Sequence, residues 1–292
     1  MSHRTAAIAA VLDEQAPPVP TLMSRAGRGH VALSHSSGRT RIIRAAATSP
    51  LKLLVPRTHG DAAWIFSSTF GGGMVGGDSV HLSLNAGPNT RCMLSTQAST
   101  KIYRTIGPSC RAELNATLAA GSILICAPDP LVCYRGARYL QHQQFHLAAS
   151  AGLVLIDTLT SGRHARGERW AFDRYHSLTE VFFDQTCIFR DRIELSPAHG
   201  PIDDPMRMGP VDCFATVVVA GDALQPFADE LLACVDAQPA PAGSVLFAAS
   251  AINHGVVIRV AGRDGEAATQ WIRQRLAFIS RLAGYDPWAR KW

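Results

Sequence analysis

Paired cysteines and long apolar runs are missing from this chain of 292 residues. Its seven cysteines are an odd number and no two have CxxC spacing, which argues against a disulfide framework and a four-cysteine zinc site. A membrane-spanning helix needs roughly 18 consecutive apolar residues, whereas the longest apolar stretches, Ile123–Ala127 and Cys213–Ala220, have the length of strands. The composition favours a protein of the reducing cytoplasm and predicts no membrane partner.

Charge is also scarce, at 17% of the chain, and only three of the 28 basic residues are lysines. The formal net charge of +5 is modest, and no stripe of basic residues is interleaved with aromatics, so nucleic acid is not an expected partner. Apolar residues make up 47% of the chain, which is too many for a disordered protein. A globular domain is therefore expected.

The apolar residues present follow a period of two over most of the chain. Ala112, Leu114, Ala116 and Leu118 alternate with polar residues, and turn signals such as 86–89 and 119–122 lie between short apolar runs. The spacing from strand to strand is roughly 8–12 residues, which is typical of an all-β body. The Ala- and Pro-rich residues 1–21 are interpreted as a disordered leader. The prediction is a mainly β fold in one domain over residues 22–292.

A helical period is found only near the end of the chain. Apolar residues repeat at steps of three and four over 224–235 and again over 267–283, which predicts two helices. Asp222 is the expected N-cap of the first helix, with Pro226 in its first turn. Gly284 is the expected C-cap of the second helix.

Gly71–Asp78 is the most unusual stretch, with five glycines before one carboxylate. Its spacing mimics a phosphate-binding P-loop, but Asp78 stands where that loop needs a lysine, and a carboxylate repels polyphosphate. One or two glycines would satisfy a tight turn. The additional glycines predict that the backbone approaches something closely, with Asp78 as a candidate functional group.

Other candidate sites are weaker. Gly27–Ala32 has neither the preceding strand nor the following helix of a dinucleotide site, and the chain has no GxSxG motif. His142 and His146 share one face of a predicted strand over 139–147 and are interpreted as surface or core histidines. Residues 161–168 are interpreted as a solvated hairpin loop. Without a nucleophile or an acid pair, the residues favour a binding or assembly protein.

Four motifs together nevertheless resemble one known family. The glycine stretch is followed by a predicted hairpin, Leu82–Met93, and then by Thr96–Arg104, which contains a TKxYR block; a GR…GE segment and an Arg-x-Trp ending come later. Their order and spacing over residues 28–292 resemble the UreD family of urease accessory proteins, also called UreH. The motif residues are Gly72, Gly73, Gly76, Gly77, Lys101, Tyr103, Arg104, Gly162, Arg163, Gly167 and Glu168.

The resemblance implies a fold and a function. The fold is a layered, helix-like winding of many β-strands with two C-terminal α-helices. The function is not enzymatic: the protein would be a scaffold that binds apo-urease and a helical UreF-like protein, which in turn holds a UreG-like GTPase. No tightly bound cofactor is implied, because Ni²⁺ would be cargo that passes through an internal polar tunnel to the urease active site.

A route for Ni²⁺ must attract the ion and also release it, so spaced oxygen ligands suit it better than thiolates or histidine cages. By resemblance the tunnel-lining residues are Asp78, Thr100, Asp157 and Asp191, with no cysteine among them. Two other hypotheses remain open: a β-scaffold hydrolase with Asp78 and Glu168 as acid and base, and a pure protein-binding scaffold without an ion path.

Overall fold

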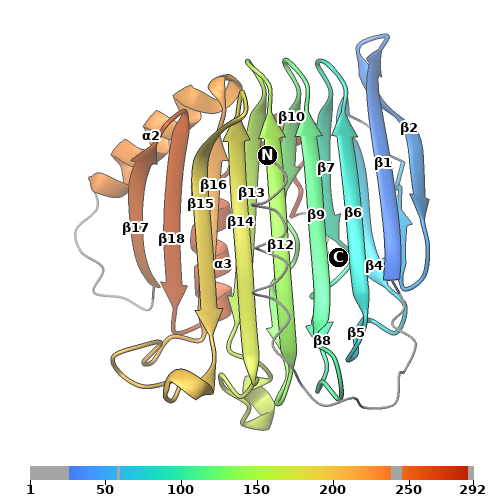
Figure 1. The fold of residues 1–292 in the computed structure, drawn as a ribbon. Helices are drawn as coiled ribbons and strands as arrows, with labels where there is room; N and C mark the ends of the chain where they lie inside the picture. The colour runs from blue at the N-terminus through green and yellow to red at the C-terminus, as the bar shows by residue number, and fades with distance from the viewer. Residues whose placement is uncertain (1–25, 58–59, 238–244, 289–292) are drawn as a thin grey trace.

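A computed structural model describes residues 26–57, 60–237 and 245–288, so the predicted leader over 1–21 lies outside the described residues. Two large sheets lie face to face (Figure 1). Sheet A has seven strands, in the order β15 (Thr186–Leu195), β14 (Arg174–Phe183), β12 (Arg138–Leu147), β9 (Cys110–Leu118), β6 (Ser79–Ala86), β1 (Ala26–Ser36) and β2 (Arg39–Ala47).

Sheet B has eleven strands, of which eight form its main path. These are β17 (Val245–Ile252), β18 (Gly255–Gly262), β16 (Cys213–Ala220), β13 (Gly152–Thr160), β10 (Ile123–Cys126), β7 (Arg91–Thr96), β4 (Ala63–Thr69) and β3 (Leu51–Leu54). The other three are short strands at one edge: β5 (Gly73–Met74), β8 (Lys101–Ile102) and β11 (Leu131–Cys133). This edge, called the lower edge below, is at the bottom of Figure 1.

The chain winds as a flattened β-helix of four coils. Each coil has a strand in sheet B, a passage along the lower edge and a strand in sheet A, and equivalent strands of successive coils pair in parallel. The predicted helix-like winding is thus confirmed. The hairpin predicted over Leu82–Met93 is wrong, because β6 lies in sheet A and β7 in sheet B; the loop over 161–168 likewise joins the two sheets.

The period of two explains why the strands bury their side chains on both sides of sheet B. Leu153 and Leu155 of β13 point into the space between the sheets, while Val154 and Ile156 point away from sheet A into a second core. The helices α2 (Gln225–Asp236), α3 (Gly265–Arg275) and α4 (Ile279–Ala283) contribute to this second core and so cover the outer face of sheet B. Parallel strands buried on both faces read as continuous apolar runs, as these do.

The helix predictions are confirmed with two corrections. Pro226 lies in the first turn of α2, and Gly284 ends α4 with a φ of 72°. Asp222 does not cap α2; it lies in a preceding 3-10 turn and pairs with His254 at 2.9 Å. The helix predicted over 267–283 is divided after Arg275 into α3 and α4. None of the described helices has the length and apolar character needed to cross a bilayer.

Candidate functional site

A cavity of about 260 Å³ lies between the two sheets in the half nearer the lower edge. Inward-facing residues of β6, β9 and β12 line it from sheet A, and residues of β4, β7, β10 and β13 line it from sheet B. It extends to the loop over 97–100, where Gln97 and Ala98 are exposed. The cavity therefore connects the interior with the lower edge.

Asp157 is one of three carboxylates that line this cavity, with Glu113 and Asp129. It lies on β13 two residues after Leu155, so the alternation of the strand directs it between the sheets. Gln141 and Gln143 of β12 donate hydrogen bonds from Nε2 to Asp157 Oδ2, at 2.7 and 2.9 Å. Burial raises the pKa of Asp157 to about 6; the two glutamine hydrogen bonds oppose the rise and the nearby Asp191 carboxylate adds to it. At pH 7 the group is mostly ionised and can attract a cation.

Neighbouring polar groups hold the glutamines in place. The Gln141 amide also donates to Ser177 Oγ at 3.2 Å and accepts from the Tyr139 hydroxyl at 3.2 Å. Buried polar groups in a satisfied network are held rigidly. The carboxylate of Asp157, which lies on a strand of sheet B, is thus held in its orientation by two glutamines of sheet A.

The other predicted lining residues have different surroundings. Thr100 lines the cavity at its lower-edge end. Asp191 lies on β15 and accepts from Arg259 Nη1 at 2.6 Å. Asp78 accepts from the backbone N–H of Val75 at 2.9 Å, which closes its own turn, and it does not line the cavity among the described residues. The structure therefore groups Thr100 and Asp157, and separates Asp78 from them.

The four residues predicted to line the route include no cysteine, but Cys126 of β10 also lines this cavity. Burial raises the pKa of the Cys126 thiol, with the Asp157 charge as a smaller cause. A protonated thiol is a poor ligand, since the thiolate is the metal-binding form. The cavity thus contains a cysteine without presenting a thiolate to a metal ion.

Three of the four sequence motifs meet along the lower edge, one coil apart; the fourth, the Arg-x-Trp ending, lies outside the described residues. Gly73 pairs with Lys101 across β5 and β8, and the Tyr103 hydroxyl donates to Gly71 O at 3.2 Å. The ring of Tyr103 packs edge-on against Tyr134, with ring centroids 5.4 Å apart. The pairing of successive coils explains why segments far apart in sequence form one surface.

The GR…GE segment continues this stack onto the last coil. The guanidinium of Arg163 lies 4.0 Å from the centre of the Tyr134 ring and binds both carboxylate oxygens of Glu168. The backbone N–H of Arg135 also donates to Glu168, at 3.2 Å. Hydrogen bonding to Arg163 is the main cause that lowers the pKa of Glu168. Tyr134, which the sequence motifs did not include, lies between Tyr103 and Arg163 and contacts both.

The motif glycines are required by close contacts and by backbone angles. A Cβ on Gly73 would lie 2.4 Å from Lys101 O, and a Cβ on Gly76 would lie 2.4 Å from Ile106 O. Gly72, Gly77, Gly162 and Gly167 have positive φ. Arg104 is exposed, and its side chain packs against Gly136. The close backbone approach predicted for the glycine stretch is thus an approach of one coil to the next.

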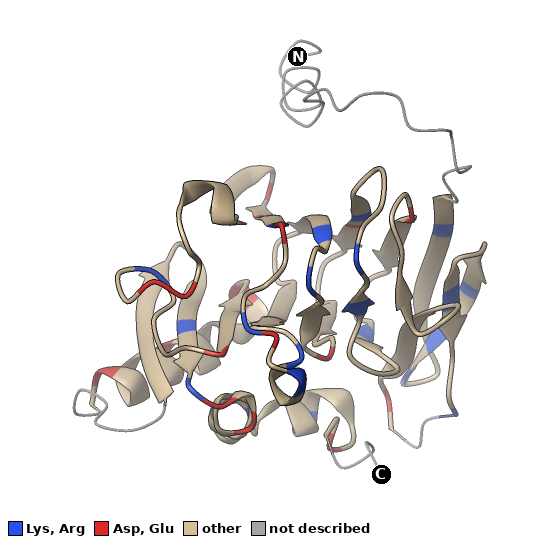
Figure 2. Ribbon diagram, turned by 90° about the horizontal axis from the view of Figure 1, so that it is seen from below, with Lys and Arg blue, Asp and Glu red and all other residues tan. Residues whose placement is uncertain are grey.

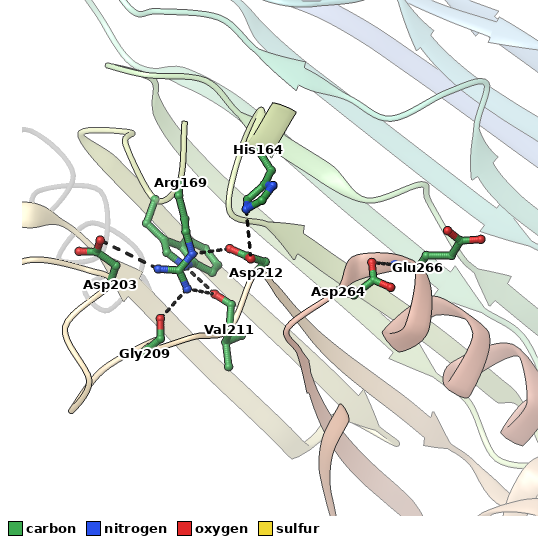
Figure 3. Close-up of polar contacts among 9 residues, drawn as sticks. His164, Arg169, Asp203, Gly209, Val211, Asp212, Asp264 and Glu266 are labelled. Atoms are coloured by element: carbon green, nitrogen blue, oxygen red, sulfur yellow. Dashed lines mark hydrogen bonds and ion pairs between the residues drawn. The ribbon is translucent and has the colours of Figure 1, made fainter. Parts of the chain in front are cut away.

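Arg169 binds the loop that precedes β16 to the lower edge (Figure 3). Its Nε donates to Asp212 at 2.6 Å and its Nη2 donates to Val211 O at 3.0 Å, while His164 lies 3.8 Å from Asp212. Seen from below, acidic and basic segments lie close together on these loops (Figure 2). The edge therefore has no field of one sign.

No group of three or more His, Cys, Asp or Glu that could hold a metal ion exists among the residues that the structure describes. His142 pairs with Glu180 at 3.0 Å and His146 stacks on Phe182, so the two histidines do not converge on a metal. Weak oxygen donors around Asp157 could accept a divalent cation without a cage. Asp78 accepts from the backbone N–H of Val75, and Glu168 accepts from Arg163.

Comparisons with known proteins agree with this architecture. The profile of the family described as "UreD urease accessory protein" matches residues 25–292. The chain is 45% identical to urease accessory protein UreD of Sorangium cellulosum over 92% of its own length and 85% of that protein. It is 44% identical to UreD of an Anaeromyxobacter species over 94% and 92%. It is 30% identical to urease accessory protein D of Arabidopsis thaliana over 89% and 99%.

Proposed function

The chain belongs to the UreD family of urease accessory proteins, and from this we propose that it is a cytoplasmic, non-enzymatic scaffold that conducts Ni²⁺ to apo-urease. One observation carries the proposal: a hollow between the sheets contains the ionisable carboxylate of Asp157 and extends to the lower edge at Thr100. The family name supports urease as the recipient, and the cavity supports a path for the ion inside the protein.

The donor chemistry of the cavity suits transit. Ni²⁺ binds strongly to thiolates and imidazoles. Here the described lining offers the carboxylates of Asp157, Asp129 and Glu113, amide and hydroxyl oxygens, and a cysteine held as the thiol. The imidazole of His142 also lines the cavity and is paired with Glu180. Asp157 is shared with two glutamine donors, so a passing ion competes with hydrogen bonds that re-form after it leaves. These groups bind a cation weakly enough to release it.

The partners follow from the family as proposals. Apo-urease is the recipient, a helical UreF-like protein is the direct accessory partner, and a UreG-like GTPase reaches the complex through it. The ion is cargo, so no resident cofactor is part of the proposal. Nucleic acid and membrane are not proposed partners.

The test is co-expression of the protein with apo-urease and its helical and GTPase partners. Asp157→Ala should leave the complex intact on gel filtration and lower the nickel content and activity of urease. An added barrier of about 1.4 kcal/mol would slow delivery about tenfold. Asp236→Ala is the matched control, because Asp236 is an exposed carboxylate at the end of α2.

Two results would change the proposal. Normal nickel content with Asp157→Ala, and again with the bulkier Asp157→Leu, would remove the ion route and leave a pure protein-binding scaffold. Loss of the complex in Asp157→Ala would show instead that this carboxylate supports assembly. Asp78→Ala separates the two roles further, because Asp78 closes a turn outside the described cavity lining.

A further inference from the structure

Polar side chains form a layer between the sheets at the height of Asp157. This layer extends from the cavity toward β18 in sheet B and β15 in sheet A. On sheet B, Asp157 pairs in register with Thr216, and Thr216 pairs with Arg259. On sheet A, Gln143 pairs with Thr179, and Thr179 pairs with Asp191. The two rows are joined at one end by the hydrogen bond from Gln143 to Asp157 and at the other end by the Arg259–Asp191 pair.

On the side away from the lower edge, the next inward-facing residues of these strands are apolar. Phe145, Val181 and Phe189 lie on one side of the row in sheet A, and Val218 lies beside it in sheet B. A cation that moves from Asp157 toward Arg259 and Asp191 therefore meets oxygen and nitrogen atoms along this row. The side chains next to the row, away from the lower edge, are apolar. Among the described residues this row continues the polar contacts of Asp157 as far as β15, whereas the contact from Gln141 to Ser177 ends at Ile193 in register.

Arg259 occupies the end of this row. Its Nη1 donates to Asp191 at 2.6 Å and to the hydroxyl of Thr216. The Arg259 side chain is 34% exposed and that of Asp191 is 16% exposed, and β15 is the edge strand of sheet A. The pair thus stands between the interior and the side of the molecule.

We propose that Arg259 is the gate of the ion route, a role that rests on the function proposed above. Its guanidinium takes the position between Asp191 and Thr216 that a cation would otherwise take. While Arg259 and Asp191 are paired, the guanidinium neutralises the Asp191 carboxylate. The positive charge of Arg259 then repels a Ni²⁺ ion that lies beside Asp157. The ion passes only when the Arg259–Asp191 pair opens.

A consequence can be measured on the purified full-length protein with Ni²⁺ alone. Arg259→Gln removes the positive charge and keeps hydrogen-bonding groups, so it should bind Ni²⁺ at least about tenfold more tightly than the native chain in equilibrium dialysis, a difference of about 1.4 kcal/mol. Adding Asp191→Asn should abolish the gain. Arg259→Lys, which keeps the charge, should bind no more tightly than the native chain.

Arg263→Gln is the matched control, because Arg263 is an exposed arginine directly after β18. It changes the net charge equally and should leave Ni²⁺ affinity unchanged. Arg259→Met serves as the second uncharged variant if thermal denaturation shows that the glutamine variant is unfolded. A merely structural role of Arg259 would lower stability without creating a nickel site.

The gate is overturned if neither uncharged variant gains affinity, or if the gain persists with Asp191→Asn. Its failure can be told apart from failure of the conduit. Unchanged dialysis results together with lost urease activation in Asp157→Leu would reject the gate and keep the route. A gain in affinity together with normal activation in Asp157→Leu would keep the masked cation site and reject its use in delivery.

Discussion

The upper and lower halves of the space between the sheets are built by the same strands and filled differently. In the upper half Leu84, Leu118, Phe145 and Leu155 are fully buried at 0% exposure. In the lower half the inward positions of the same strands include Gln141, Gln143 and Asp157 around a cavity. Moving two residues along β12, from Phe145 to Gln143, passes from one half to the other.

The difference shows that a coil of parallel strands does not require a solid interior. The ladder between coils supplies the backbone hydrogen bonds in both halves, and dense side-chain packing is needed in only one. In the lower half the polar groups partner each other across the two sheets, which removes the cost of burying them alone. One half stabilises the fold, and the other is free to carry a function.

The largest expected effect is on the packed half. Phe145→Ala should lower the free energy of unfolding by about 3–5 kcal/mol, because it deletes a fully buried ring from a close-packed region. Gln143→Ala, two residues away, should cost about 1–2 kcal/mol, because its loss leaves Asp157 with Gln141 as a donor. Urea denaturation measures both, and equal costs would contradict the division into a solid and a hollow half.

The lower edge provides the next test. Gly76→Val should destabilise the protein by about 2–4 kcal/mol, because a Cβ there meets Ile106 O at 2.4 Å. Gly38→Val is the comparison: its φ of 73° is positive, unlike that of Gly76, and no atom lies within 4 Å of its Cβ. Thermal unfolding of both variants separates the close contact between coils from strain of the backbone alone.

The buried carboxylate should make stability depend on pH. The pKa of Asp157 rises from 3.8 to about 6 on folding, so the folded state holds this proton more tightly than the unfolded state. The resulting stabilisation is complete below about pH 4 and is lost as pH rises through 6. Asp157→Asn should therefore stabilise the protein by up to about 3 kcal/mol at pH 8.

The same comparison at low pH is the control. At pH 4 both the native chain and Asp157→Asn carry an uncharged side chain at this position in the folded state, so their unfolding free energies should converge. Urea denaturation at pH 4, 6 and 8 follows the convergence. A difference that is constant with pH would show that Asp157 is not the titrating group.

The smallest effect should distinguish ion pairs at the two ends of the coils. Glu168→Gln should cost about 1–3 kcal/mol, because Glu168 is 8% exposed and its carboxylate binds Arg163. Asp222→Asn should cost under about 0.5 kcal/mol, because the Asp222 and His254 side chains are 50% and 42% exposed. Similar costs would show that burial does not decide the strength of these pairs.

The sequence alone was sufficient for features that depend on neighbouring residues. The alternation of Ala112 to Leu118 placed β9, the steps of three and four placed α2, and the crowding of glycines indicated a close backbone approach, because each pattern arises within a few residues. The motif order was sufficient for the family. Thr100 and Asp157, which the resemblance suggested as tunnel-lining residues, both line the cavity, and their part in ion transit stays a prediction.

Only the tertiary structure decided which strands pair and which polar groups meet. An alternating strand after a turn looks the same whether it forms a hairpin or enters the opposite sheet, so the hairpin over Leu82–Met93 could not be tested locally. The partners of Asp157 and Asp191 come from β12 and β18, distant in sequence, and Asp78 differs from them only in what surrounds it. Pairing between coils creates those surroundings, and no local pattern records it.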